Sequence, residues 1–576
     1  SAKCTTLQQE NFPLFKRRLS PGSSCYQCRH HMKNIPLNTL DFAVVATYFL
    51  VVLGLVGVML WRERGKPRSS ESSSYFLGGR NMGWFVIGAS LFASNIGSEI
   101  LVGLAGAGAS GDFPAGQMEI LAAVMLLLLG WLFVPFYLRS GVYTMPAFLE
   151  KRYSTWARSY LSWISILGYI LTKISVTIAA GGVVFTALLG INFWTGALIT
   201  ILATGLYTVI GGLKAVLYTD LLQLFVLLAG AVAVSYYGLE ALGGWDQVAA
   251  RTTPAYTSLW RSISDPDFPW TGILFGAPIL GVWYWCTDQF IVQRVLAAKN
   301  IQEARKGTIF AGYLKLLPLF LFVVPGVIAY ALSTGTDPVL VFPERNGAPL
   351  YDAALPLMTT QLLPAGLRGL VAAGLLAALM SSLSSVFNSC ATLFTFDIYQ
   401  RYRPEASPAH LVWVGRIFTV ILVGLGLAWI PMLELIEGGL YQSLQSIQSY
   451  IAPPIAAVFL LGLFLPRLHA AGAQAALLTG AFLGLLRLLL EVSGWALPTA
   501  LHWFVAINFL HFALFLFLLC SGILIAVSYI LPAKRDETLV NNLTLSKGPR
   551  SPINTGNVAL SIFLLLCIAA LWYFFA

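Results

Sequence analysis

Charge is the scarcest property of this sequence. Only 10% of its 576 residues are charged, whereas 57% are hydrophobic, compared with about 25% and about 45 to 50% in soluble globular domains. Most of the chain is therefore expected to lie in a lipid bilayer. The formal charge of +10 does not indicate nucleic-acid binding, because the basic residues are scattered among short loops, where they set membrane orientation.

Residues for catalysis and metal binding are also sparse. The chain has seven cysteines and six histidines, and the cysteines do not have the spacing of a disulfide framework. No set of nucleophile, base and orienting group recurs at membrane depth, so the protein is not expected to be an enzyme. Residues 1–36 lack apolar periodicity and are expected to form a poorly ordered extracellular tail.

Long apolar runs, in contrast, are abundant. A helix needs about 20 apolar residues to cross roughly 30 Å of hydrocarbon, and fourteen runs are long enough. No soluble domain fits between them, so we expect residues 37–576 to form a single transmembrane domain that is entirely α-helical. The runs are centred on 40–60, 84–107, 119–138, 160–189, 195–211, 220–239, 270–290, 308–331, 363–395, 411–430, 444–464, 473–491, 504–530 and 557–575.

The distribution of basic residues predicts the orientation. Loops that follow the first, third and seventh runs are basic, and these loops are cytoplasmic by the positive-inside rule. An even number of spans then places both termini outside the cell, although the basic N-terminal tail favours the opposite orientation. The basic residues in these three loops are, in order, Arg62, Arg64, Lys66, Arg68 and Arg80 after the first run, Arg139, Lys151, Arg152 and Arg158 after the third, and Arg294, Lys299, Arg305 and Lys306 after the seventh.

Two of the apolar runs are interrupted. Polar and glycine residues at 94–99 break the run Ala89–Gly108, and Pro278 and Gly281 precede the polar, aromatic stretch Trp283–Gln289. Such interruptions are tolerated only where they are buried in protein or line a water-filled cavity. Breaks five spans apart suggest a transporter of two inverted repeats around a midplane site. The repeats would be about 84–239 and 270–464, with peripheral helices at 40–60, 473–491, 504–530 and 557–575.

Charged and amide side chains within the runs are candidates for function, because such groups are expensive at membrane depth. The alternative is that they pair with one another and lock helices together. The candidates are Asn95, Glu99, Glu119, Lys173, Asp220, Asp288, Lys315 and Gln445.

Hydroxyl groups cluster in the run 363–395. Ser381, Ser384 and Ser385 share one helical face. Sodium prefers hydroxyl and carbonyl oxygens, and unwound backbone near Ala93 and Ile96 would add carbonyls, so a sodium site between these two runs is reasonable. The alternative is that the serines bond to their own helix and permit close packing.

Aromatic residues suggest a sugar or another polyol as the solute. Trp283, Tyr284 and Trp285 lie at the second break, where they could stack on the apolar face of a ring. Asn95, Glu119, Lys315 and Gln445 could then bond its hydroxyls. Packing or anchoring at the membrane interface is the alternative role of the tryptophans.

Several motifs strongly resemble the sodium/glucose cotransporter family, from about residue 40 to the C-terminus. The resemblance implies a LeuT-type fold with a 5+5 inverted repeat, and sodium-coupled sugar import by alternating access at the plasma membrane. The motifs that carry it are Ala89–Ser98, Gly130–Pro135, Tyr218–Asp220, Trp283–Gln289, Gly312–Leu316 and Met380–Ser385.

The resemblance also implies roles for individual residues. Matching positions give a sugar site at Asn95, Glu119, Tyr284, Trp285, Lys315 and Gln445. The matching positions of the general sodium site are Ala93, Ile96, Ala378, Ser381 and Ser382. A second sodium site, which is found in some members, matches Asp220, Ser384 and Ser385.

Two positions depart from the family pattern. Ile100 stands where a histidine or glutamine commonly contacts the sugar, and Gly281 stands where threonine or asparagine is frequent. Losing hydrogen-bonding side chains should relax or redirect sugar selectivity. A symporter for myo-inositol or another small polar solute, and a sugar sensor that does not accumulate its ligand, therefore remain alternatives to a glucose or galactose symporter.

Overall fold

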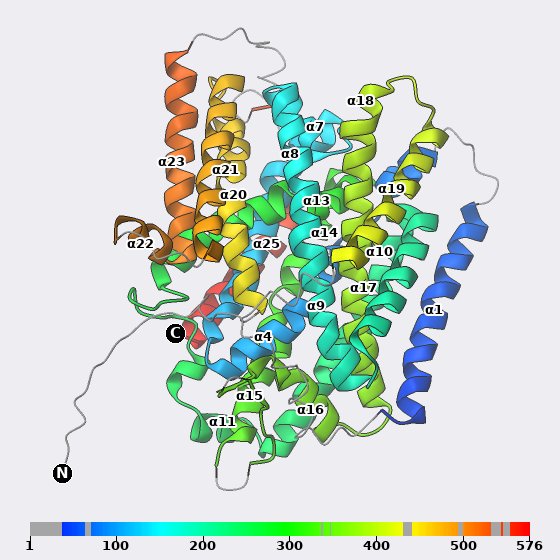
Figure 1. Ribbon diagram of the computed structural model, residues 1–576, viewed down its shortest axis with the longest axis vertical. Coiled ribbons are helices and arrows are strands. Elements are labelled where there is room, and N and C mark those ends of the chain that lie inside the picture. Colours follow the sequence, from blue (N-terminus) through cyan, green and yellow to red (C-terminus); the bar gives the residue numbers. More distant parts are fainter. Residues whose placement is uncertain are drawn as a thin grey trace.

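The computed structural model describes residues 37–63, 71–335, 338–345, 347–429, 440–493, 499–531, 543–544 and 553–576. The predicted tail at residues 1–36 lies outside these residues. Within them, eleven helices are long and apolar enough to cross a membrane, or twelve if one bent pair counts as a single span. Figure 1 shows long helices such as α1, α10, α17 and α23 running roughly parallel. The protein is therefore a multi-pass membrane protein, as the composition predicted.

The spanning elements follow the expected apolar runs. In chain order they are α1 (Thr39–Glu63), α3 (Trp84–Asn95), α4 (Ser98–Ser110), α5 (Gly116–Leu128), η5 (Leu129–Phe133), α6 (Val134–Ser140), α8 (Thr155–Gly168), η6 (Tyr169–Ile174), α9 (Ser175–Val183), η7 (Val184–Leu188), α10 (Phe193–Leu242), η9 (Gly272–Gly276), α12 (Ala277–Gly281), η10 (Val282–Thr287), α13 (Gln289–Leu296), α14 (Ile301–Leu314), η11 (Leu319–Val323), α15 (Val324–Ser333), α17 (Leu367–Leu393), η13 (Phe394–Tyr399), α19 (Pro408–Trp429), α20 (Leu440–Phe464), α21 (Ala470–Ser493), α23 (Phe509–Ile530) and α25 (Thr555–Phe574).

Shorter elements connect the spanning helices. They are α2 (Glu71–Leu77), η3 (Gly78–Arg80), η4 (Phe113–Ala115), α7 (Met145–Arg152), α11 (Asp246–Arg251), η8 (Pro254–Thr257), η12 (Tyr351–Ala353), α16 (Ala354–Leu362), α18 (Gln400–Tyr402), α22 (Thr499–Ala506) and the antiparallel strands β1 (Glu344–Arg345) and β2 (Ala348–Pro349).

Two features explain why the structure gives fewer spans than the fourteen predicted runs. The runs at 195–211 and 220–239 together make up α10, in which two helices are joined at a kink at Gly212 (φ 56°, ψ −157°), and the two count as one span in this total. Only glycine adopts this conformation readily, and a Cβ at Gly212 would lie 2.5 Å from the carbonyl oxygen of Tyr75. The run at 270–290 contains only a short apolar helix at 272–287. The count of fourteen stays a prediction.

The interruption predicted at residues 94–99 is confirmed. Helices α3 and α4 meet at an angle of 63°. Between them, Ile96 (φ −79°, ψ 83°) is not helical and Gly97 (φ −82°, ψ 172°) is extended. The Gly97 carbonyl oxygen accepts from the backbone N–H groups of Ile100 and Leu101, each at 3.1 Å. The first turn of α4 is therefore rebuilt directly after the break, and the break is short.

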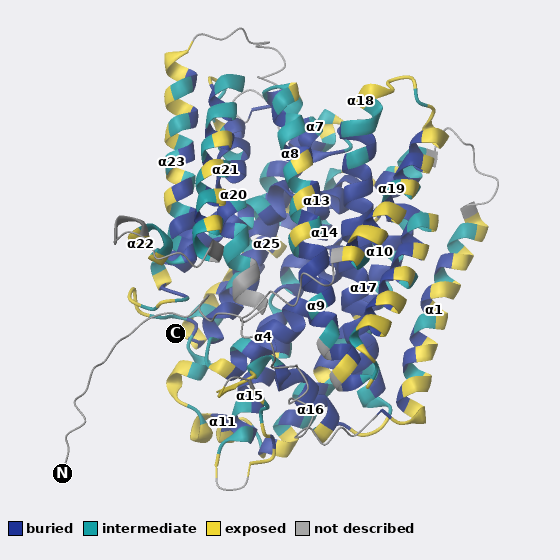
Figure 2. Cartoon of the chain, viewed as in Figure 1, coloured by how far each residue is buried: buried dark blue, intermediate teal, exposed yellow. Residues whose placement is uncertain are grey.

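Helix α17 lies at the centre of the bundle. Within the span Leu367–Tyr402, which begins with α17, 94% of the most apolar 18-residue stretch is buried. The corresponding value for the span Thr39–Arg62 is 22%. Figure 2 shows the same contrast, because dark blue fills the middle of the molecule and yellow follows the outer faces of α1 and α23. Helices α3 and α10 pack on α17, so the broken helix is held against the most buried helix.

Side-chain caps fix where the helices beside the second break begin. The Asp288 carboxylate accepts from the Phe290 N–H at 3.2 Å and starts α13. The Asn300 side chain accepts from the Glu303 N–H at 2.9 Å and starts α14. Such caps satisfy N–H groups that the helix leaves unpaired. They set the register of the two helices that carry Arg294 and lead to Lys315.

Candidate functional site

A cavity of about 60 Å³ lies between the broken helix α3/α4, α5, η6, the segment α12–η10 and α20. One water needs roughly 10 to 15 Å³ in such a cavity, so this space takes a solute of several heavy atoms. Five of the six residues predicted for the sugar site line it, namely Asn95, Glu119, Tyr284, Trp285 and Gln445.

The sixth predicted residue, Lys315, lies directly behind this lining. It follows α14 and is fully buried. Its ammonium group donates to the Asn95 side-chain oxygen and to the Glu119 carboxylate. A buried charge is tolerated when it is paired and hydrogen-bonded. Lys315 therefore holds the polar groups of Asn95 and Glu119 in place at the wall of the cavity.

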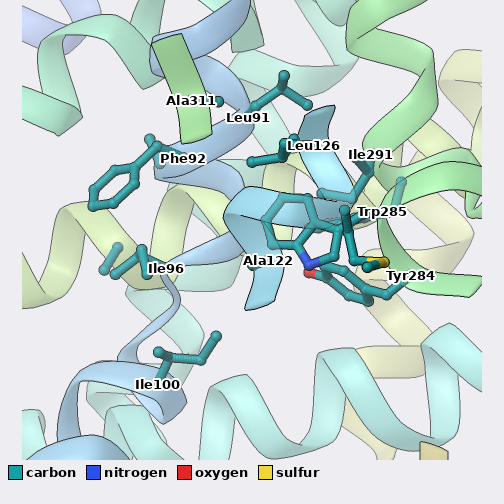
Figure 3. Close-up of a cluster of buried hydrophobic side chains, with 14 of the residues drawn as sticks. Leu91, Phe92, Ile96, Ile100, Ala122, Leu126, Tyr284, Trp285, Ile291 and Ala311 are labelled. Atoms are coloured by element: carbon teal, nitrogen blue, oxygen red, sulfur yellow. The ribbon is translucent and has the colours of Figure 1, made fainter. Parts of the chain in front are cut away.

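Tyr284 connects the network to two further helices. Its phenolic oxygen accepts from the Asn95 side-chain N–H at 2.9 Å and from the Lys173 ammonium at 2.7 Å. Both Lys173, on η6, and Tyr284, on η10, lie in π-helical turns, which occur frequently at functional sites. Figure 3 shows the Tyr284 and Trp285 side chains next to each other, with Ile96 and Ile100 along the broken helix.

Lys173 was missing from the predicted sugar site, although its charge had marked it as a candidate for function. It is buried and lines the cavity. Its ammonium nitrogen lies 4.5 Å from the centroid of the Tyr284 ring and 4.3 Å from that of Phe290. The lysine is thus held by aromatic faces and one hydroxyl. Sequence spacing gives no sign that these groups meet.

Both positions that depart from the family pattern lie at the cavity. Ile100 and Gly281 line it together with a group of apolar side chains. A Cβ on Gly281 would lie 2.6 Å from Cγ of Met125, so the thioether side chain of Met125 fills the space that a larger residue would need. This part of the wall therefore offers no side-chain hydrogen bond. The other apolar members are Met118, Leu121, Ala122, Ala277 and Leu280.

The residues predicted for the first sodium site are all buried, on the broken helix and on α17. The Ser382 hydroxyl donates to the carbonyl oxygen of Ser94 at 3.1 Å, which joins α17 to the last turn before the break. The Ser381 hydroxyl instead donates to Asp220 at 2.6 Å. Ala93, Ile96 and Ala378 would contribute backbone carbonyl oxygens.

The residues predicted for the second sodium site are only partly brought together. Asp220 accepts from the hydroxyls of Ser90 at 2.5 Å and Ser94 at 2.9 Å, and Ser385 donates to the Ser94 hydroxyl at 3.0 Å. Ser384 bonds back to the Ser381 carbonyl at 3.0 Å within its own helix, which is the alternative that the sequence left open.

Arg294 is a further residue that sequence reasoning left out of the candidate sites. It was assigned to a cytoplasmic loop, but it is fully buried on α13 beside Asp220. Arg305, assigned in the same way, is also buried, on α14. The structure places both residues in helices rather than in a loop, and α13 packs on α3 and α17 inside the bundle. Their cytoplasmic side stays a prediction. The apolar residues that flank Arg294, such as Ile291 and Val295, were the available signal.

Clusters of titratable metal ligands are absent from the part of the chain that the structure describes. No group of three or more histidine, cysteine, aspartate and glutamate side chains there could hold a metal ion. Serine hydroxyls and backbone carbonyls at the helix break suit a hard monovalent cation.

Comparison with known proteins agrees with this geometry. The sodium:solute symporter family matches residues 75–480. Sodium/glucose cotransporter 2 of Rattus norvegicus is 41% identical, with 90% of this chain and 82% of that protein covered. The sodium/myo-inositol cotransporter of Homo sapiens is 40% identical, with 89% and 76% covered.

Solved structures show the fold. A Na⁺-coupled sialic acid symporter, in a substrate-bound outward-open state, matches with a TM-score of 0.74 at 22% identity over 86% of this chain and 99% of its own. A nucleobase-cation-symport-1 family transporter in a closed conformation matches with a TM-score of 0.51 at 14% identity, over 82% and 98%. Both have the LeuT fold. The chain therefore shares that fold and belongs to the sodium:solute symporter family, in the group that includes the sodium/glucose cotransporters.

Proposed function

We propose that the protein is a sodium-coupled symporter that imports a monosaccharide, such as glucose or galactose, across the plasma membrane by alternating access. The observation that carries this proposal is the network of Asn95, Glu119, Lys315 and Tyr284 at one cavity between two interrupted helices. It offers donors and acceptors for hydroxyl groups beside the face of Trp285. The matched relatives are cotransporters rather than enzymes.

The proposed architecture has fourteen transmembrane helices and both termini outside the cell. Repeats at about 84–239 and 270–464 would form two inverted halves around the cavity, with peripheral helices at 40–60, 473–491, 504–530 and 557–575. Support comes from the two breaks five predicted spans apart, which both contribute to the cavity.

Sodium is proposed to bind between α3 and α17, at Ala93, Ile96, Ala378, Ser381 and Ser382. The Ser382 bond to Ser94 shows that α17 reaches the break. An ion there would fix the end of α3, and Asn95 is the last residue of that helix. Because Asn95 also belongs to the proposed sugar site, ion and solute would stabilise the same conformation, which is the reciprocal coupling that symport requires.

The number of coupled sodium ions determines how much free energy is available for solute accumulation. One Na⁺ that moves through 100 mV contributes about 2.3 kcal/mol before any concentration gradient. A second ion at Asp220, Ser384 and Ser385 would double this contribution and square the achievable accumulation ratio. The hydroxyls gathered around Asp220 support such a site.

A second candidate is symport of myo-inositol or another small polar solute. It is favoured by the apolar wall at Ile100 and Gly281 and by the likeness to the human sodium/myo-inositol cotransporter. A sugar sensor that binds without accumulating its ligand is the third candidate.

Uptake into proteoliposomes tests these candidates. Labelled glucose, galactose, other hexoses and myo-inositol are offered with an inward Na⁺ gradient and with an equal choline gradient. We expect accumulation of one monosaccharide only with Na⁺, and loss of that accumulation when an ionophore collapses the gradient. Accumulation of myo-inositol alone would select the second candidate, and binding without accumulation would select the sensor. The absence of both for every solute would contradict the proposal.

A further inference from the structure

Arg294 lies within the cluster of hydroxyls that surrounds Asp220. Its Nε donates to the hydroxyl oxygens of Ser90 at 3.1 Å and Ser94 at 2.7 Å, and one terminal nitrogen donates to the Ser385 hydroxyl. The Nε lies 4.0 Å from the Asp220 carboxylate, and both side chains are completely buried. Helices α3, α10, α13 and α17 meet at this point.

The guanidinium uses the same oxygen lone pairs that a cation would use. The hydroxyls of Ser90 and Ser94 each donate their proton to Asp220 and accept from Arg294. A sodium ion bound at Asp220 would need these hydroxyl oxygens as ligands. Arg294 and a bound ion therefore cannot use the hydroxyls at the same time.

Electrostatic repulsion also prevents Arg294 and a sodium ion from occupying the cluster together. The guanidinium neutralises the Asp220 carboxylate in a place that water does not reach. A sodium ion beside the guanidinium would add a second positive charge within a few ångströms, and like charges repel strongly in a low-dielectric interior. Removing Arg294 would leave the carboxylate buried without a counter-charge, which is strongly destabilising. The cluster thus holds one monovalent cation at a time.

We propose that Arg294 is a tethered cation that competes with sodium for Asp220, so that an ion binds there only when the guanidinium withdraws. This proposal rests on the sodium coupling proposed above and goes beyond it, because it gives the second ion site a resident competitor. The competition lowers the affinity of that site for Na⁺.

Withdrawal of Arg294 also provides a route from the ion to the solute site. Arg294 lies on α13, which follows η10 after the single residue Asp288. Tyr284 and Trp285 lie on η10 and line the solute cavity. A shift of α13 that frees Asp220 therefore acts on the aromatic wall of the solute site.

The competition between Arg294 and Na⁺ can be tested without a transport assay, by measuring Tm as a function of the Na⁺ concentration. The full chain is purified in lipid nanodiscs and melted across a NaCl series, with choline chloride keeping ionic strength constant. Ligands that bind the native state raise Tm as their concentration rises. We expect Arg294→Gln to be less stable than the wild type without Na⁺, and to reach half of its Na⁺-induced rise in Tm at an about tenfold lower concentration.

Two further variants make the outcome decisive. Arg294→Lys keeps the charge but has no planar fork to hold several hydroxyls, so its half-effective Na⁺ concentration should lie between those of the wild type and Arg294→Gln. It also serves if Arg294→Gln does not fold. Arg305→Gln is the matched control, since Arg305 is equally buried but lies against Trp131 and the Gly130 carbonyl. It should lower Tm and leave the Na⁺ dependence unchanged.

The outcomes separate this proposal from the sodium coupling on which it rests. If Na⁺ stabilises the wild type and both Arg294 variants with the same half-effective concentration, competition by Arg294 is overturned and coupling at the first site stands. If Na⁺ stabilises neither the wild type nor any variant, both proposals fail. Arg294→Gln is expected to respond to a lower Na⁺ concentration than the wild type. If this gain is lost in the double variant Arg294→Gln/Asp220→Asn, the ion that causes it binds at Asp220.

Discussion

The side-chain amide of Asn95 donates a hydrogen bond to the phenolic oxygen of Tyr284 over 2.9 Å. Asn95 ends α3 at the first break, and Tyr284 lies in the π-helical turn of the second. The same oxygen accepts from Lys173 at 2.7 Å, so one hydroxyl joins three segments of the bundle. A solute hydroxyl that enters the cavity must exchange hydrogen bonds with this network.

Removing the Tyr284 hydroxyl should weaken solute binding. In Tyr284→Phe the donors of Asn95 and Lys173 lose their shared acceptor, and an unsatisfied buried donor costs about 1 to 3 kcal/mol. We expect the solute concentration for half-maximal uptake to rise roughly ten- to 100-fold, as measured by Na⁺-driven uptake into proteoliposomes.

Tyr153→Phe is the matched control for this prediction. The Tyr153 hydroxyl donates to the Val458 carbonyl at 2.9 Å, and Tyr153 is not part of the cavity lining. Its loss should reduce stability slightly and leave solute affinity as it is. Equal effects of the two variants on affinity would show that the Tyr284 hydroxyl has no special role.

Ser382→Ala should weaken sodium dependence. The change removes a hydroxyl that reaches the Ser94 carbonyl at the helix break, and with it one proposed sodium ligand. We expect the Na⁺ concentration for half-maximal uptake to rise about fivefold or more, since a hydrogen bond or ligand of this kind contributes roughly 1 kcal/mol.

Ser389→Ala tests whether the effect is specific to position 382. Ser389 is buried on the same helix, α17, and its hydroxyl has no hydrogen-bond partner among the residues that the structure describes. The variant should behave like the wild type. Unchanged Na⁺ affinity in Ser382→Ala would remove this residue from the sodium site.

The break in α3/α4 could be predicted because its cause is local. A membrane helix that contains Asn95, Gly97 and Glu99 must lie against protein or water, and the structure bends there by 63°. The sequence predicted a boundary between the runs 195–211 and 220–239, where the kink at Gly212 lies. The kink itself could not be predicted, because the pair Gly211–Gly212 in an apolar run is compatible with a straight helix, a kink or two separate spans.

Arg294 shows why part of the site could not be predicted. The positive-inside rule counts basic residues near the ends of spans. Arg294 follows the predicted run 270–290, so the sequence places it just outside the membrane. Whether the next helix returns into the bundle depends on tertiary packing, which sequence distance does not contain. Asn95, Glu119 and Gln445 at the cavity were predicted from polar side chains within apolar runs and again from matching motifs. The Lys173–Tyr284 bond, in contrast, follows from the fold alone.

Asp112 should make stability depend on pH. It lies in the turn between α4 and η4 and accepts from the Ser110 hydroxyl at 2.8 Å. Burial raises the pKa of this carboxyl above its usual value, and the Ser110 bond and Arg261 lower it only in part. The folded state thus binds the proton more tightly than the unfolded state, so stability falls as pH rises from about 4 through the raised pKa.

Asp112→Asn should remove this part of the pH dependence. Melting curves between about pH 4.5 and 7.5 should show a smaller fall of Tm with rising pH than in the wild type, because the amide does not ionise. Asp246→Asn removes an exposed carboxylate on α11 and should leave the slope unchanged. A slope that is the same in all three proteins would contradict the role of Asp112.

Ile100→Gln should redirect selectivity towards hexoses. Ile100 lines the cavity in the first turn of α4, so a glutamine there places an amide beside the bound solute. A new hydrogen bond is worth about 0.5 to 1.5 kcal/mol, or roughly three- to tenfold in affinity. Competition by unlabelled glucose should strengthen accordingly, whereas competition by an analogue without the contacted hydroxyl should not. Ile100→Leu is the apolar control.

Gly281→Thr is expected to gain less affinity for hexoses than Ile100→Gln, because its Cβ would lie 2.6 Å from Cγ of Met125 and the thioether must first move. If glutamine and leucine at position 100 give the same order of solutes, the contacted hydroxyl faces another part of the wall, and the selectivity of this site is set by Glu119 and Gln445 instead.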